Sequence, residues 1–255
     1  EQSEKLKFIQ DTLKKLNKQL LIIIAPSKAT FFPEYIPDEW RTEKTRTNYD
    51  AYLENFESKK IDYINFNSWF LSLKNKSAHP LYPQYGVHWS IYGTYLAFDS
   101  IIKNIEAGKK YDLPELKNIR YELPDTLRSP DDDVYRGMNL LLKPKSYQMA
   151  YPILDVQEDS TKTKPSLLVV ADSYFWSINN FWLMDKVFNN YRFMFYYHDI
   201  ISHSSPQKTV SQLNMKDEIK RSDIIILLCR TADLHRLGWG FIDDCYSFYK
   251  VEKTK

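Results

Sequence analysis

The run Ser166-Leu-Leu-Val-Val-Ala171, followed directly by Asp172-Ser173-Tyr174, is the most informative stretch of the chain for its fold. A short, continuous apolar run is typical of a strand that is covered on both faces, as strands in parallel sheets are. Residues 175–188 carry a pattern that predicts a helix. The stretch therefore predicts a strand, a tight turn and a helix, with a serine at the carboxyl end of the strand.

The same alternation of strands and helices extends to both sides of this unit. Further strands are predicted at residues 20–25, 61–64, 192–197 and 224–228, and helices at 4–20, 47–59 and 209–220. The most regular helix follows Ser90, whose hydroxyl is a suitable N-cap. Strands that alternate with helices indicate βαβ units and a mostly parallel sheet. We therefore predict one three-layer α/β/α domain over residues 1–255.

Residues 107–164 interrupt this alternation of strands and helices. They are rich in proline and contain the acidic triplet Asp131-Asp132-Asp133. We interpret this segment as an insertion or lid, with a short helix near residues 134–142.

Composition excludes several classes of protein. The chain has 255 residues and a net charge of +2, and no apolar run approaches the roughly 20 residues needed to span a bilayer. A basic stripe for nucleic acid is absent, and two cysteines do not make a disulfide framework. The chain begins at Glu1 without a signal peptide. We therefore expect a mature protein or a fragment, and removal of an export signal stays open.

Two segments place reactive side chains where a parallel sheet gathers them, at the carboxyl ends of its strands. Ser173 follows a predicted strand, and its backbone N–H could hold an oxyanion at the start of a helix. The alternative, that Asp172 or Ser173 only caps this helix, has equal weight. The second segment is Tyr85-Gly-Val-His-Trp-Ser90, in which His88 could accept the proton of Ser173. A histidine beside aromatic residues is, however, more often a packed structural residue.

Taken together, three blocks resemble a known family. Residues 82–93, with Gly86-Val-His88-Trp89, look like the Asp-x-His-Trp block of the SGNH-hydrolase-like domains of the alginate O-acetylation family (AlgX/AlgJ-like, DHHW-type). Ala171-Asp-Ser-Tyr174 is similar to the Gly-Asp-Ser-Phe block that carries the family's nucleophile, and residues 25–37 look like its early Pro-x-Lys-Ala segment. The resemblance implies a flavodoxin-like SGNH fold, and His before Ser is the family's permuted motif order.

Carried over by residue, the resemblance makes Ser173 the nucleophile and His88 the general base, and it gives supporting or substrate-binding places to four residues: Asp172, Trp89, Lys28 and Tyr174. The family's acid lies two residues before the histidine, where this chain has Gly86. Loss of that acid can cost a triad about 10⁴-fold in rate. Three explanations stay open: a Ser-His dyad, an acid from elsewhere in the chain, or an inactive descendant.

The resemblance implies a carbohydrate O-acetyltransferase or acetylesterase that works through an acyl-enzyme in the periplasm or outside the cell. Its partners would be a glycan substrate and a membrane-bound acyl donor, with no nucleic acid and no cofactor. We expect no metal site, because His198 and His203 have no third ligand at metal spacing. One alternative is an inactive carbohydrate-binding or assembly protein, and a less favoured one is a lipase-like hydrolase.

Overall fold

The computed structural model describes residues 1–41, 45–142, 145–157, 159–201 and 208–253. Within this part of the chain, seven strands form one sheet in the order β2-β1-β9-β5-β6-β7-β8. They are β1 (Gln19–Ala25), β2 (Tyr63–Asn65), β5 (Ser166–Ala171), β6 (Asn189–Phe195), β7 (Asp199–Ile201), β8 (Lys208–Thr209) and β9 (Ile224–Arg230). The first five strands in this order are parallel, and β7 and β8 extend the edge in antiparallel fashion.

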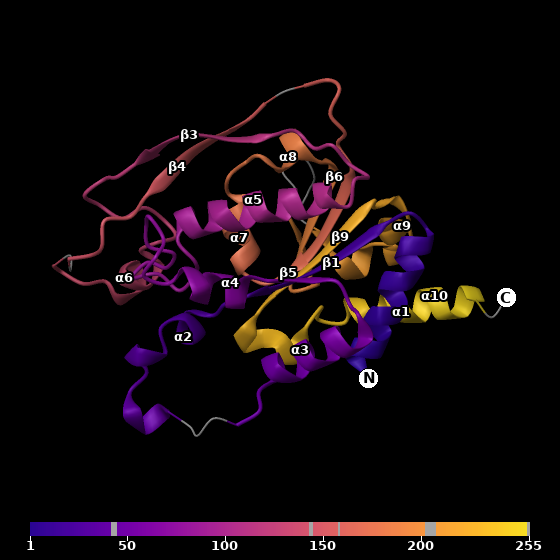
Figure 1. Cartoon of the computed structure of the whole chain (residues 1–255), viewed down its shortest axis with the longest axis horizontal. Coiled ribbons are helices and arrows are strands. Elements are labelled where there is room, and N and C mark those ends of the chain that lie inside the picture. The colour runs from indigo at the N-terminus through magenta and orange to yellow at the C-terminus, as the bar shows by residue number, and fades with distance from the viewer. Residues whose placement is uncertain (42–44, 143–144, 158, 202–207, 254–255) are drawn as a thin grey trace.

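Helices cover both faces of the sheet (Figure 1). Leu21, Ile23 and Ala25 of β1 face a core shared with α4 (Phe66–Leu73), α5 (Ile91–Ala107) and α7 (Tyr174–Asn179). The alternate residues of the same strand face a second core, shared with α1 (Gln2–Lys15), α3 (Asn48–Lys59) and α10 (Phe241–Lys253). Successive strand side chains point to opposite faces, so the uniformly apolar strands fill two cores. The predicted α/β class with a large, mostly parallel sheet is confirmed.

Three predicted elements are divided or shortened in the structure. The helix predicted at 175–188 is divided into α7 and α8 (Met184–Val187), because Trp182 between them has a left-handed backbone with φ 58°. The strand predicted at 192–197 ends at Phe195, since Tyr196 and Tyr197 are also left-handed. The helix predicted at 209–220 becomes a 3-10 turn, η3 (Val210–Gln212), and α9 (Met215–Arg221), which Asn214 caps.

Residues 107–164 have structure of their own beside α5. β3 (Leu116–Glu122) and β4 (Tyr151–Val156) form an antiparallel pair, which lies over the α5 face of the molecule in Figure 1. Between these strands lies the short helix α6 (Asp133–Met138). It begins one residue before the helix predicted at 134–142 and ends four residues before it. The sequence pattern missed β3, β4, β7, β8, α4 and α10.

Candidate active site

The turn after β5 and the loop before α5 bring Ser173 and His88 together. The Nε2 atom of His88 lies 2.9 Å from the Oγ atom of Ser173, although the two residues are 85 positions apart. Both side chains are partly exposed, so a small molecule can reach them. Ser90 holds the start of α5 as predicted, because its hydroxyl accepts a hydrogen bond from the Gly93 amide.

An aspartate from the 107–164 segment completes a chain of hydrogen bonds. Asp133, the first residue of α6, places Oδ2 3.2 Å from Nδ1 of His88. Its other carboxyl oxygen accepts a hydrogen bond of 3.0 Å from the Val87 amide. The second bond fixes the carboxylate against residues 84–90, the histidine loop, which carries His88 and leads into α5. The arrangement Ser173–His88–Asp133 has the connectivity of a Ser-His-Asp triad.

The position where the resemblance places an acid is closed by packing. A Cβ atom on Gly86 would lie 2.7 Å from Cγ of Pro83 and 2.9 Å from the carbonyl oxygen of Pro130. Pro130 belongs to the same segment that brings Asp133 to His88. Of the three explanations for the missing acid, the geometry therefore favours an acid from elsewhere, which the sequence did not identify.

Asp172 is engaged away from His88. It is fully buried, and its two carboxyl oxygens accept hydrogen bonds from the amides of Tyr174, at 2.9 Å, and Arg230, at 2.7 Å. Burial raises the pKa of Asp172 to about 6, and these two amides oppose the rise. Asp172 thus braces the Ser173 turn against the end of β9, and it caps α7 where the Ser173 hydroxyl does not.

Trp89 and Tyr174 connect the two segments that carry the reacting pair. Trp89 is fully buried and donates from Nε1 to the Tyr174 carbonyl oxygen, 3.2 Å away. Tyr174 in turn donates its hydroxyl to the Val87 carbonyl oxygen, 3.1 Å away, and the two rings pack edge to face. These bonds set the distance between the histidine loop and the serine turn, so both residues support the site.

Lys28 also holds the histidine loop. Its Nζ atom donates to the carbonyl oxygens of Gln84, at 2.8 Å, and Gly86, at 2.7 Å. Burial lowers the pKa of the Lys28 amine, and nearby Asp133 partly offsets this effect. These contacts match a supporting role for Lys28, in which its amine orients the loop that carries His88.

The electrostatics of the site keep His88 neutral. Burial lowers the pKa of His88, nearby Asp133 raises it, and the Arg230 cation lowers it. The net direction is downward from 6.5, so the imidazole is unprotonated at neutral pH and can accept a proton. The Ser173 amide makes no hydrogen bond to any described residue, so it remains an available donor.

The described residues offer no metal-binding cluster. Within them, no group of three His, Cys, Asp or Glu side chains is arranged to hold a metal ion. His198 pairs with Asp199, and His203 lies outside the described residues. No helix in this part of the chain combines the length and apolar character that crossing a bilayer requires.

A family model provides the decisive comparison. The model described as "SGNH hydrolase-like domain, acetyltransferase AlgX" matches residues 1–168, about two thirds of the sequence. The chain belongs to this family. The match includes His88 and Asp133 and ends before Ser173, so the serine turn of this AlgX-type domain is placed by structure and not by the family model. No curated protein matches the sequence.

Solved structures share the fold at low sequence identity. The O-acetyltransferase domain of Pseudomonas putida AlgJ is 11% identical, with a TM-score of 0.56 and coverage of 96% of this chain and 89% of the other. A DHHW family protein from Eubacterium siraeum is 12% identical, with a TM-score of 0.55 and coverage of 95% of this chain and 88% of the other. Bacillus cereus PatB1 with a sulfonyl adduct is also 12% identical, with a TM-score of 0.54 and coverage of 91% of this chain and 89% of the other. At these identities the likeness establishes the SGNH-like fold alone.

Asp133 is the site residue that sequence reasoning missed. The signal was the triplet Asp131-Asp132-Asp133, three acids together in an otherwise proline-rich segment. Nothing in that pattern says which of the three carboxylates faces His88. The choice depends on how α6 packs against the histidine loop, where the amides of Val134 and Tyr135 both donate to the Tyr85 carbonyl oxygen.

Proposed function

We propose that this AlgX-type domain is a carbohydrate O-acetyltransferase or acetylesterase that uses Ser173 as its nucleophile, His88 as its general base and Asp133 as its orienting acid. The observation that carries the proposal is the continuous hydrogen-bonded chain from the Ser173 hydroxyl through the imidazole to the Asp133 carboxylate. The acetyltransferase description of the family supports the reaction class.

In the proposed reaction, the Ser173 oxygen attacks the carbonyl carbon of an acetyl ester while His88 Nε2 takes the hydroxyl proton. The Ser173 amide, which makes no hydrogen bond within the described chain, donates to the developing oxyanion. The imidazolium then returns its proton to the departing alcohol, which leaves acetyl-Ser173. A sugar hydroxyl or water attacks this ester next, again with His88 as the base, and Ser173 is regenerated.

Asp133 serves His88 in both half-reactions. Its carboxylate accepts a hydrogen bond from the Nδ1–H group, so that Nε2 is the unprotonated nitrogen and is directed at Ser173. It also stabilises the imidazolium that forms in each transition state. In this proposal, the chain is a single domain in which residues 107–164 form an insertion. The insertion supplies Asp133 to a site whose other two residues, Ser173 and His88, are positioned by the sheet and its helices. This role is in addition to the role as a lid that the sequence suggested.

The substrate and place of action follow from the family. We propose a glycan of the cell envelope as acceptor, a membrane-bound protein as acyl donor, and a periplasmic or extracellular site of action. The family's description as an acetyltransferase supports this assignment.

Release of acetate from 4-nitrophenyl acetate tests the nucleophile. The wild-type protein should hydrolyse the ester, and Ser173→Ala should reduce the rate by at least about 10⁴-fold. Ser177→Ala is a matched control, since Ser177 is a buried serine of the same helix that makes no contact with His88. A Ser173→Ala protein with unchanged turnover would overturn the assignment.

The same preparation distinguishes the inactive alternative. A binding or assembly protein would retain oligosaccharide affinity and show no hydrolysis in the wild type. The enzyme should also become inactive when methanesulfonyl fluoride modifies Ser173, because sulfonyl fluorides react with activated serine hydroxyls. Modification elsewhere, with Ser173 intact, would favour the binding protein.

A further inference from the structure

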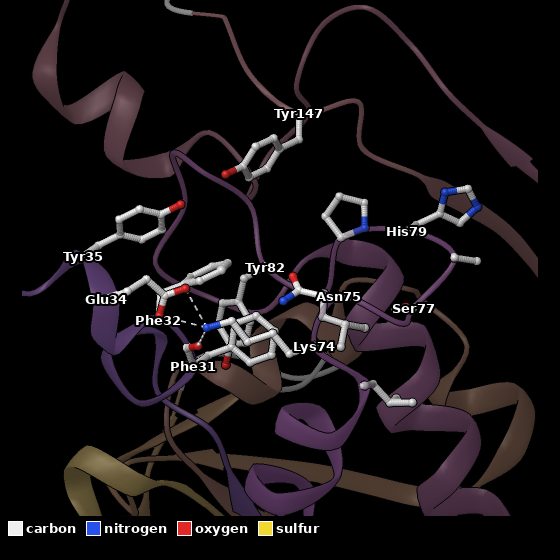
Figure 2. Close-up of a pocket in the computed structure, with 14 residues that line it drawn as sticks. Phe31, Phe32, Glu34, Tyr35, Lys74, Asn75, Ser77, His79, Tyr82 and Tyr147 are labelled. Carbon is white, nitrogen blue, oxygen red and sulfur yellow. Dashed lines mark hydrogen bonds and ion pairs between the residues drawn. The ribbon is translucent and has the colours of Figure 1, made fainter.

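A second concave region lies beside the reacting residues, between α2 (Lys28–Phe31), η1 (Pro33–Tyr35), the chain after α4 and residue 147 of the insertion (Figure 2). The cavity has a volume of about 420 Å³. This lies within the range of pockets that bind small ligands, roughly 300–1,000 Å³. None of its lining residues belongs to the Ser173–His88–Asp133 chain.

Two tyrosines stand at the mouth of this pocket. Tyr35 is 68% exposed and Tyr147 is 43% exposed, and Figure 2 shows their hydroxyl groups directed toward one another across the opening. They come from distant parts of the chain, η1 and the insertion. The two hydroxyl groups lie close enough for the Tyr35 side chain to raise the pKa of Tyr147. Each residue is partly exposed at the rim, where a large aromatic ring can stack on a partly apolar ring of a ligand.

The floor is aromatic as well. Phe31 and Tyr82 are buried and their ring centroids lie 4.8 Å apart, and Phe32 packs edge-on to Phe31 at 4.7 Å. The Tyr82 hydroxyl donates to the Pro26 carbonyl oxygen. Figure 2 also shows the polar side chains of Asn75, Ser77 and His79 around the pocket. The lining combines ring faces with hydrogen-bonding groups, which is the combination that the two kinds of surface on a sugar ring require.

The charges of the pocket cancel. Lys74 donates from Nζ to both carboxyl oxygens of Glu34, at 2.7 and 2.9 Å, and to the Phe31 carbonyl oxygen. Its cation also lies 4.9 Å from the centre of the Phe32 ring. Among the described lining residues, Lys74 is the one Lys or Arg side chain. A ligand carboxylate would therefore compete with Glu34 for a cation that is already satisfied.

The pocket shares a wall with the reacting site. Tyr82 lines the pocket, and burial together with the neighbouring Tyr174 raises its pKa well above the usual range. Tyr174 directly follows Ser173 in sequence. The same stretch, residues 78–82, continues into the loop that carries His88. Tyr82 therefore lies between the pocket and the turn that carries Ser173.

We propose that this pocket is a subsite for a neutral hexose unit of the acceptor glycan, with Tyr35 and Tyr147 at its rim. The inference rests on the proposed function and names the chemistry of the acceptor: an uncharged sugar, stacked on tyrosine and hydrogen-bonded by the side chains around the floor. A uronate unit is disfavoured because the Glu34–Lys74 pair leaves no cation for its carboxylate.

Saturation-transfer NMR and calorimetry with defined tetrasaccharides test the subsite. The probes are neutral tetramers of glucose, mannose, galactose and N-acetylglucosamine, with tetragalacturonate as the anionic probe. At least one neutral tetramer should bind wild-type protein more tightly than tetragalacturonate does. Tyr35→Ala and Tyr147→Ala should each weaken that binding by about tenfold, with unchanged melting temperatures.

Trp40→Ala is the matched aromatic control. Trp40 is 74% exposed and lies in the neighbouring η2 (Asp38–Trp40), but it does not line the pocket. Its replacement should leave binding unchanged. Equal losses in Trp40→Ala and Tyr147→Ala, or tighter binding of tetragalacturonate to the wild type, would overturn the proposal.

A gain of affinity tests the charge argument. Glu34→Gln frees the Lys74 cation, so affinity for tetragalacturonate should rise about tenfold. No rise would contradict the role of the pair. Because binding is read without turnover, the two proposals fail separately: ester hydrolysis with no tetrasaccharide binding overturns the subsite, whereas neutral-sugar binding with no ester hydrolysis overturns the proposed function.

Discussion

The edge of the sheet and the 107–164 segment contribute to the same site in different ways. Ser173 follows β5 and His88 precedes α5, and both of these elements pack into a buried apolar core. Asp133 comes from a segment of two strands and one short helix beside that sheet. The positions of Ser173 and His88 thus depend on the parallel-sheet framework, while the position of Asp133 depends on how residues 107–164 pack against it.

Identifiable contacts join α6 and the residues before it to the loop that carries His88. Asp133 bonds His88 and the Val87 amide, and the Gly86 backbone lies against Pro130 and Asp131. Substitutions at this junction should therefore impair catalysis while the sheet stays folded.

Replacing the acid should have the largest effect. Asp133→Asn should lower kcat by about 10⁴-fold, because the imidazolium loses its partner and the tautomer is no longer fixed. Since Asp133 raises the pKa of His88, its loss should also move the acid limb of the pH–rate profile to lower pH. Ester hydrolysis between pH 4.5 and 8 measures both effects, to about a tenth of a pH unit.

Asp125→Asn is the control for this variant. Asp125 is an exposed acid of the same insertion, and its replacement should change neither rate nor profile. Equal activity of Asp133→Asn and wild type would show that the insertion plays no part in the chemistry.

Asp131 gives the insertion a pH-dependent stability. Its carboxyl group is buried and near the Tyr151 hydroxyl and the Ile91 amide, yet it forms no well-aligned hydrogen bond with the described residues. Burial raises its pKa from 3.8 to about 7, so the folded state holds a proton that the unfolded state has released. This contribution to stability is therefore lost as the pH rises from about 4 through about 7.

Asp131→Asn removes the charge without changing the shape. The variant and the wild type should have similar unfolding free energies near pH 4. Above pH 7 the variant should be more stable, by up to about 4 kcal/mol. Urea unfolding at several pH values measures the difference, and a gap that does not grow with pH would refute the argument.

Restoring the acid that the family places before the histidine should fail. Gly86→Asp forces a Cβ atom against Pro83 and Pro130, so it should lower the unfolding free energy by about 1–3 kcal/mol and reduce ester hydrolysis. Thermal unfolding together with the rate measures the effect. A stable Gly86→Asp protein with increased activity would mean that position 86, and not the insertion, is the place of the acid.

The smallest effect on activity is expected from Lys28, whose amine holds the histidine loop. Lys28→Met removes the hydrogen bonds to the Gln84 and Gly86 carbonyl oxygens and should lower kcat/KM by about tenfold. Arginine at the same position can still donate, so Lys28→Arg should recover part of the activity. Identical rates for the two variants would indicate that the bonds do not position His88.

The sequence predicted the parts of the molecule that follow from periodic burial. The apolar runs of β1, β5 and β9 and the spacing of α5 predicted the sheet and its main helix. The motif blocks predicted a pairing of Ser173 with His88, and the structure places these two side chains 2.9 Å apart. It overextended the helix at 175–188 because the left-handed Trp182 leaves no mark in apolar spacing. It missed the β3–β4 pair, whose residues alternate less clearly. The single-domain organisation over 1–255 stays a prediction.

Asp133 could not be predicted for a different physical reason. Its role depends on long-range docking of α6, which local pattern does not encode. The sequence shows that Gly86 stands where the family has an acid. Only the structure shows that Pro83 and Pro130 fill the space that a side chain at position 86 would need. Asp172, next to the serine, is fully occupied by backbone amides, which sequence reasoning anticipated as a bracing role.

The most direct test of the account is to locate the acyl group. Wild-type protein mixed with 4-nitrophenyl acetate, quenched in acid within the first turnover and mapped by peptide mass spectrometry should carry one acetyl group on Ser173. Asp133→Asn should acquire the same group about 10⁴-fold more slowly, and Asp125→Asn at the wild-type rate. An acetyl group on another residue, or equally fast labelling of Ser173 in Asp133→Asn, would contradict a nucleophile activated through His88 by an acid of the insertion.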